Sequence, residues 1–306
     1  MKKQILLLII LTVFLCIGTA QIAAAENNIE MGIKQLKGDT QYEISGGEWA
    51  SELIFPLDSK IMEIKYEKED FAIEGRDLYF KYGQTIAGDD ISGFEDSDWL
   101  NGDSGRDIYS TGSVDLDSKI FDIGLKYHNQ IDESRAKWVF VLGYQIIEHD
   151  SEVHSAVGHS GDSNILINNG ETALIYESEY NIPYIGAGYN FKFSNHFSLS
   201  GSLKWSPISQ VEDQDDHVLR NKVANSEADG NTYILNIVSD YEINRSWQGY
   251  LDASYSYSDL DGTQTQEWYG DDPATDYDDT GTRVTDINYE NRQEVITLGF
   301  GFKYKF

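Results

Sequence analysis

Beyond about residue 26, apolar and polar residues alternate along the chain with a period of two, and helical periodicity is hard to find. The clearest run closes the chain and places six apolar or aromatic residues on one face: Ile296, Leu298, Phe300, Phe302, Tyr304 and Phe306. Further alternating runs begin near Trp138, Phe197, Leu235 and Leu251, and the faces opposite the apolar ones are mostly small or polar in the runs from Phe197 and Leu251. This pattern predicts an all-β fold.

Two all-β architectures fit such alternation. A soluble sandwich turns its apolar faces inward, whereas a transmembrane barrel turns them toward lipid and its polar faces toward the interior. The polar faces here are rich in Ser, Gly and Asn, and the chain ends on an aromatic strand at Phe306. We therefore favour an antiparallel outer-membrane β-barrel, with a secreted soluble all-β domain as the alternative.

We expect ten strands, an even number that places both termini on the periplasmic side. They lie near residues 28–45, 49–68, 70–86, 106–129, 134–152, 171–193, 196–212, 228–245, 247–261 and 289–306. The outward loops should then be about 46–48, 87–105, 153–170, 213–227 and 262–288. Each strand exceeds the roughly 9–11 residues that cross a bilayer, so the barrel should extend above the membrane on the extracellular side.

The first 25 residues have the layout of a secretory signal peptide. Lys2 and Lys3 precede an apolar run, and Ala23, Ala24 and Ala25 supply small residues before a cleavage point. We expect residues 1–25 to be removed and residues 26–306 to form a single barrel domain. Cys16, the only cysteine, lies in the removed segment, which leaves no thiol for a disulfide or a metal site.

The chain is strongly acidic. Its formal net charge is −29, which becomes −31 when Lys2 and Lys3 are removed with the signal. Such a charge disfavours binding to nucleic acid phosphates and attracts cationic partners. We expect cationic peptides or proteins and outer-membrane lipid as partners, with the protein itself a monomer.

Two acidic runs carry the candidate chemistry. Asp215 and His217 lie two residues apart, so on a strand they share a face, and a carboxylate can orient an imidazole that acts as a base. Asp96 and Asp98 have the same spacing, and two close carboxyls should retain a proton near neutral pH. Facing one another across a cleft, the two pairs could hold a water molecule for hydrolysis, with His217 as its base.

These residues, with motifs elsewhere in the chain, resemble the omptin family of outer-membrane endopeptidases. The motifs are Ser51-Glu52-Leu53, Asp96-Ser97-Asp98-Trp99, Gly143-Tyr144-Gln145, Ile182-Pro183-Tyr184-Ile185-Gly186, Asp213-Gln214-Asp215-Asp216-His217 and Gly301-Phe302-Lys303-Tyr304-Lys305-Phe306. The resemblance implies a ten-stranded barrel that cleaves peptides between or next to basic residues. It implies Asp96, Asp98, Asp215 and His217 as catalytic residues, with the active site on the extracellular side.

The resemblance also implies two acids that hold the basic side chain of a substrate. Asp213 matches one of them. Asp39 matches the other through its spacing to Tyr42, provided that a one-residue gap precedes Gly46-Gly47. A carboxylate pair suits a guanidinium or ammonium group, because such hydrogen bonds are charge-assisted.

Family members carry a lipopolysaccharide-binding patch built partly from arginines. This chain has Glu148 and Glu179 at the matching positions and Ile146 where an acid is expected. Acids there should repel lipid phosphates, so activation by lipopolysaccharide is doubtful here. We expect no other cofactor and no metal.

Strict alternation from Phe197 to Trp205 would point Asp213, Asp215 and His217 out of the barrel. A catalytic role therefore requires a β-bulge or local twist before Asp213. We place it at Ser206-Pro207, since proline cannot donate to a strand ladder.

Other interpretations remain open. The acidic stretch 267–279 could bind Ca²⁺, but it lacks the spacing of a dedicated loop and is better interpreted as a solvated loop that attracts cationic peptides. The other histidines, including His149, should lie on the surface. The function could also be that of a non-catalytic barrel, an adhesin or cation-binding surface protein, or of a narrow porin.

Overall fold

The computed structural model describes residues 27–100, 106–129, 135–160, 163–166, 171–273 and 277–306, and most of them lie in antiparallel strands. The strands are β1 (Asn27–Gly46), β2 (Trp49–Pro56), β3 (Ser59–Lys68), β4 (Arg76–Ala87), β5 (Ile91–Trp99), β6 (Ile108–His128), β7 (Ala136–Ser160), β8 (Ser163–Leu166), β9 (Thr172–Lys192), β10 (Phe197–His217), β11 (Lys222–Glu242), β12 (Trp247–Trp268) and β13 (Arg283–Lys305). A 3₁₀ helix, η1 (Val218–Arg220), follows β10. The expected signal peptide, with Cys16, lies outside the described residues.

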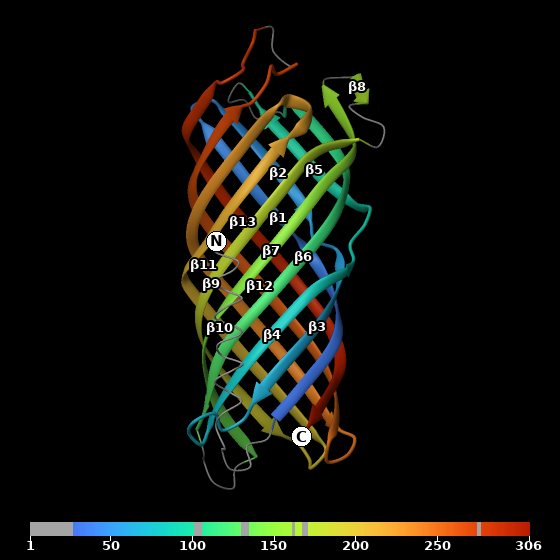
Figure 1. Cartoon of the computed structure of the whole chain (residues 1–306), viewed down its shortest axis with the longest axis vertical. Coiled ribbons are helices and arrows are strands. Elements are labelled where there is room, and N and C mark those ends of the chain that lie inside the picture. Colours follow the sequence, from blue (N-terminus) through green and yellow to red (C-terminus); the bar gives the residue numbers. More distant parts are fainter. Residues whose placement is uncertain (1–26, 101–105, 130–134, 161–162, 167–170, 274–276) are drawn as a thin grey trace.

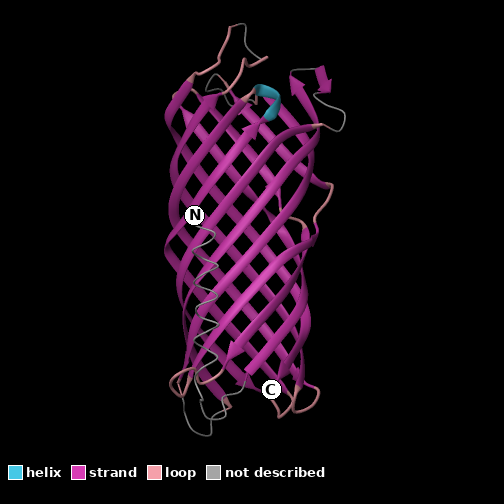
Figure 2. Cartoon of the chain, in the orientation of Figure 1, coloured by secondary structure: helices cyan, strands magenta, loops and turns pink. Residues whose placement is uncertain are grey.

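The strands close into a tall barrel of tilted strands (Figures 1 and 2). Around one end the ring runs β1-β3-β4-β6-β7-β9-β10-β11-β12-β13 and back to β1. Toward the other end β2 and β5 replace β3 and β4, because β1 pairs with both β3 and β2 while β6 pairs with both β4 and β5. Ten strands thus surround the interior at both levels, and the predicted ten-stranded barrel is confirmed.

Both ends of the described chain meet at one end of the barrel. The backbone amides of Asn27 and Phe306 each donate to the other residue's carbonyl, both at 3.0 Å. We call this the lower end and the opposite one the upper end, as drawn in Figure 1.

Several expected upper loops are instead strand. Residues 91–99, expected in a loop, form β5, which bridges β2 and β6. Of the expected loop 213–227, only residues 218–221 leave the ladder, because β10 continues to His217 and β11 begins at Lys222. The acidic residues of these stretches therefore sit on the barrel wall, where neighbouring strands fix their direction.

The outer surface of the lower barrel is apolar. The alternating residues of the last strand, including Phe300 and Phe302, are exposed, as are Leu142 and Leu251 on other strands. Aromatic pairs such as Trp138 with Tyr189 lie on the same outer surface. Apolar faces turned outward contradict a soluble sandwich, whose apolar faces would be buried. In the described part of the chain, no helix is long and apolar enough to cross a membrane.

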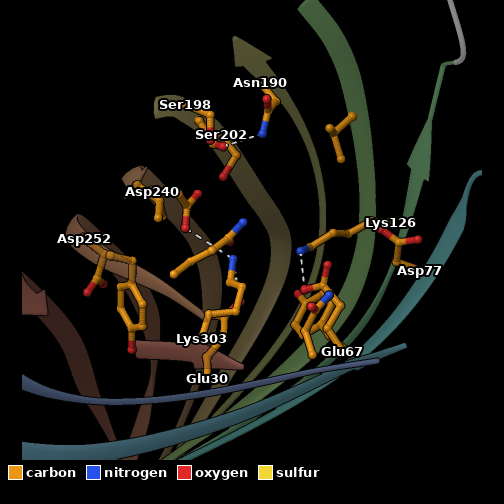
Figure 3. A pocket seen from close by; sticks show the side chains of 18 of the residues that line it. Glu30, Glu67, Asp77, Lys126, Asn190, Ser198, Ser202, Asp240, Asp252 and Lys303 are labelled. Atoms are coloured by element: carbon orange, nitrogen blue, oxygen red, sulfur yellow. Dashed lines mark hydrogen bonds and ion pairs between the residues drawn. The ribbon is translucent and has the colours of Figure 1, made fainter. Parts of the chain in front are cut away.

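Charged residues of both signs line the interior of the lower barrel around a cavity of about 650 Å³ (Figure 3). Lys126 binds Glu67 at 2.6 Å, and Lys303 binds Asp240 at 3.3 Å. Lys204, with Asp122 at 3.3 Å, continues this network further up the interior. Ion pairing offsets the cost of placing these charges inside the barrel.

An aromatic layer separates this network from the upper end. The rings of Tyr42, Phe55, Tyr176 and Tyr289 contact one another and are at most 1% exposed. Tyr180 packs nearby and donates to Asn291 at 2.8 Å. Side chains thus fill the barrel at this level, which argues against an open water-filled pore.

Candidate active site

Strand β10 carries a bulge that reverses which residues face inward. Its pairing with β11 shifts between Ser206 and Ser209, and its pairing with β9 shifts between Trp205 and Gln210. Before the shift Trp205 is exposed, whereas beyond it Val211 is buried. The bulge contains Pro207, which has no N–H to give to a ladder. The predicted bulge is therefore confirmed, and it turns Asp213 and Asp215 into the barrel, where both are buried.

Asp215 and His217 form a pair at the upper end of β10. The Nε2 atom of His217 lies 2.9 Å from Oδ2 of Asp215, and the hydroxyl of Tyr42 on β1 donates to the same oxygen. Burial alone would raise the pKa of Asp215, but the charge of His217 and the hydrogen bonds from His217 and Tyr42 lower it. Burial lowers the pKa of His217, although Asp215 partly opposes this. Asp215 is thus ionised, and His217 is neutral near pH 7.

Asp96 and Asp98 lie on β5, near the opposite side of the ring from β10. They pair with Leu53 and Ser51 of β2, which fixes them to the wall rather than to a free loop. Burial and the charges of Asp98 and Asp215 together raise the pKa of Asp96 to about 7. The influence of Asp215 places the carboxyl pair and the Asp215–His217 pair in one electrostatic environment.

Asp213 precedes Asp215 by two residues on β10 and so lies on the same inner face of the strand. Its Oδ2 accepts hydrogen bonds from Tyr289 and from Tyr176, the latter at 3.1 Å, while its buried Oδ1 has no partner among the described residues. Burial raises the pKa of Asp213 to about 7, although the hydrogen bonds from Tyr289 and Tyr176 oppose this. Its register partners are Ser178 on β9 and Ser226 on β11.

The structure places Asp39 on the other side of the wall. Asp39 pairs directly with Glu294 of β13, which is exposed on the outer surface. Its neighbour Thr40 and, two residues further, Tyr42 are the inward residues of β1, each 1% exposed. Because alternate residues of a strand face opposite sides, the expected position of Asp39 beside Asp213 is wrong.

The acidic stretch after β12 is not a free solvated loop. Asp272 is fully buried and accepts two hydrogen bonds from Arg220, at 3.0 and 2.8 Å, and one from Trp268 at 3.2 Å. The side chain of Asn221 donates to the Asp271 carbonyl at 2.8 Å, and the Tyr269 hydroxyl donates to Asp216 at 3.0 Å. These contacts fasten residues 268–272 to the turn that follows His217. Asp276 of this stretch lies outside the described residues.

The remaining expectations concern His149, the two acids on the outer wall and metal binding. His149 is not at the surface but inside the barrel, bonded to Ser118 at 2.7 Å and to Gln293 at 3.1 Å. Glu148 and Glu179 do lie on the outer face, directly opposite one another on β7 and β9. No group of three or more His, Cys, Asp or Glu side chains in the described ranges could hold a metal ion.

Sequence reasoning missed three groups near the site: Tyr42 as a donor to Asp215, Arg220 as the anchor of the following loop, and Lys222. The last could have been found from the hairpin, because a turn over residues 218–221 pairs His217 with Lys222. The expected loop over 213–227 concealed this pairing.

Comparison with known proteins identifies the family to which this barrel belongs. The sequence model described as the Omptin family matches residues 37–306. Protease 7 of Escherichia coli O157:H7 is 24% identical over 246 residues, covering 73% of this chain and 72% of that protein. The outer membrane protease OmpP of Escherichia coli strain K12 is 24% identical over 233 residues, covering 69% and 68%. The crystal structure of the outer membrane protease OmpT from Escherichia coli superposes with a TM-score of 0.76 at 16% identity, covering 94% of this chain and 99% of that one. Because the family match spans most of the sequence, the chain belongs to the omptin family.

Proposed function

We propose that this protein is an outer-membrane endopeptidase that hydrolyses peptide bonds next to basic residues. The proposal rests chiefly on the 2.9 Å contact between His217 and the buried carboxylate of Asp215, opposite a second carboxyl pair. The proteases among its relatives support the same reaction class.

We infer a role for each imidazole nitrogen of His217 from this contact. Nε2–H of His217 donates to Asp215, which leaves Nδ1 to accept a proton from water. Asp96 and Asp98 hold that water and, through the proton they retain, the scissile carbonyl. The attacking oxygen bonds to the carbonyl carbon as its proton passes to His217, which later returns the proton to the leaving amine.

Asp213 supplies the preference for a basic side chain. Its Oδ1 and the hydroxyl oxygen of neighbouring Ser178 are both buried, with no hydrogen-bond partner in the described structure. Unpaired acceptors suit the donors of an ammonium or guanidinium group, whose charge would also favour ionised Asp213. Because Asp39 faces outward, Asp213 alone remains of the two acids expected for this pocket, and a single basic residue beside the cleavage point should suffice.

We also propose that the upper end faces the cell exterior and that activity does not need lipopolysaccharide. Glu148 and Glu179 are direct neighbours on the outer wall, and Glu212 adjoins Glu179 on β10. Three neighbouring acids repel lipid phosphates, and Lys119 beside them already lies near Glu148 at 3.7 Å.

The test is cleavage of a fluorogenic Arg-Arg peptide by purified barrel in detergent, with and without added lipopolysaccharide. We expect wild-type cleavage, loss of most activity in His217→Ala and Asp96→Ala, and little effect of the lipid. A Gln-Gln peptide is the matched substrate control. An active His217→Ala protein would contradict the proposed base, and an inactive wild type would favour a non-catalytic surface barrel.

A further inference from the structure

Lys222 brings a positive charge to the inner face of the barrel beside the Asp215–His217 pair. It is the first residue of β11, and in the β10–β11 ladder it lies directly opposite His217. Residues directly opposite in a ladder project to the same face of the sheet. Lys222 is only 6% exposed, although lysine is rarely buried without a partner.

Within the described part of the chain, the ammonium of Lys222 has no carboxylate partner. No acidic oxygen there comes within 4.0 Å of it, and Nζ lies 5.9 Å from the centroid of the Trp268 ring. Burial and the charge of Arg220 lower the pKa of Lys222, and Asp215, Asp96 and Asp98 are close enough to oppose this in part. The ammonium therefore stands among the proposed catalytic groups with its donors unused.

Arg220, the other cation near the Asp215–His217 pair, is already bound to a carboxylate. Arg220 donates twice to Asp272, at 3.0 and 2.8 Å, and so holds the following loop. Arg220 is thus held on a buried carboxylate, whereas the ammonium of Lys222 is not bound to any carboxylate of the described residues and can donate to a substrate.

We propose that Lys222 is a catalytic residue whose ammonium donates a hydrogen bond to the carbonyl oxygen of the scissile peptide bond. This inference rests on the proposed function. When water attacks the carbonyl carbon, the C=O electron pair moves onto oxygen, and a water proton moves to His217. Lys222 stays protonated and stabilises the oxyanion; the C=O bond then re-forms, the C–N bond breaks, and His217 protonates the leaving amine. Donors aimed at a developing oxyanion act on the transition state.

The main test compares Lys222→Met with Lys222→Arg in the peptide assay. Methionine keeps the length and loses the charge, so kcat should fall about 100-fold while KM changes less than about threefold. Arginine should retain part of the activity. Lys37→Met, which removes an exposed lysine from the outer wall, is the matched control and should leave kcat unchanged. Heat-dependent gel mobility checks that each barrel is folded.

Two further readouts distinguish catalysis from mere packing. Lys222→Ala should regain activity when propylamine is added, because a small ammonium can enter the space left by the side chain. Loss of Lys222 should also move the acid limb of the pH–rate profile to higher pH, since Lys222 lowers the pKa of His217. The charged groups that act on His217 are Asp215 on β10, Arg220 on η1 and Lys222 itself, and Asp96 and Asp98 on β5 act in turn on Lys222.

The outcomes separate this inference from the proposed function. If wild type cleaves, His217→Ala does not, and folded Lys222→Met keeps kcat within threefold of wild type, the oxyanion role is wrong and the peptidase proposal stands. If wild type cleaves no basic peptide, the peptidase proposal and the oxyanion role of Lys222 are both wrong. Amine rescue of Lys222→Ala with unchanged KM supports both.

Discussion

The hydroxyl of Tyr42 on β1 and the imidazole of His217 on β10 donate to the same carboxylate oxygen, Oδ2 of Asp215. Two strands far apart in sequence thus fix one carboxylate of the proposed site, and through it the tautomer and direction of the imidazole. The donors also stabilise the ionised form of Asp215, in agreement with its lowered pKa.

Tyr42→Phe should lower kcat about tenfold or more while the barrel still folds. It removes a buried hydrogen bond to a charged group, which contributes about 1.5–3 kcal/mol. Steady-state cleavage of the Arg-Arg peptide measures the effect. Tyr180→Phe is the control, because that hydroxyl donates to Asn291 and not to a carboxylate of the proposed site. Equal effects of the two substitutions would show that only packing is affected.

Activity should depend on pH through both pairs. The pKa of His217 lies below its usual 6.5, so the base is protonated and activity falls only at a pH lower than 6.5. Asp96 loses the retained proton near pH 7, which should give a decline above that pH. Asp98→Asn removes a like charge and should lower the pKa of Asp96, moving the decline to lower pH. A flat profile from about pH 5 to 8 would contradict these roles.

Asp213→Asn should stabilise the barrel at alkaline pH and weaken binding of basic peptides. The folded-state pKa of about 7 exceeds the usual 3.8, so the folded protein binds a proton that the unfolded chain has released. Wild-type stability therefore falls as pH rises from about 4 to 7, by up to about 4 kcal/mol, and stays lower above 7. Guanidinium unfolding at pH 4 and pH 8 measures this. A variant whose stability falls as steeply as that of wild type would exclude Asp213 as the titrating group.

Deleting Ile208 should reverse which residues at the end of β10 face the barrel interior. Across the bulge, β10 contains one residue more than the paired segment of β11 and one more than that of β9, and the deletion removes this extra residue. In the intact chain, cysteine at position 212 should react with an impermeant maleimide faster than cysteine at 213, since Glu212 is exposed and Asp213 is buried. The deletion should reverse this order and abolish cleavage. An unchanged labelling order would show that the bulge does not set the direction.

Arg220→Gln should loosen the loop that follows β12. Asp272 is fully buried and would lose two hydrogen bonds from the guanidinium. Because Arg220 is itself partly exposed, we expect a moderate effect: protease nicking of this loop about tenfold faster, or about 1.4 kcal/mol. Arg292→Gln, which breaks an exposed pair with Asp259, is the control. If both variants are nicked equally slowly, the Arg220–Asp272 contact does not hold the loop.

The order of residues along each strand was enough to determine much of this architecture. Period-two alternation ending at Phe306 predicted a barrel with apolar residues outside, because side chains on a strand alternate between two environments. The same rule, applied to Trp205 and Asp213, required a bulge that the structure contains. The pairing of Asp215 with His217 also follows from their spacing of two residues.

The tertiary structure decided what depends on neighbouring strands. Polar stretches such as residues 91–99 and 213–217 look like loops in isolation, and only pairing with β2, β6, β9 and β11 makes them strand. The inward direction of Tyr42, the outward direction of Asp39 and the burial of Lys222 follow from register, which no local pattern fixes. Burial then sets the pKa values of Asp96 and Asp213, because desolvation depends on what packs around a carboxyl and not on its place in the sequence.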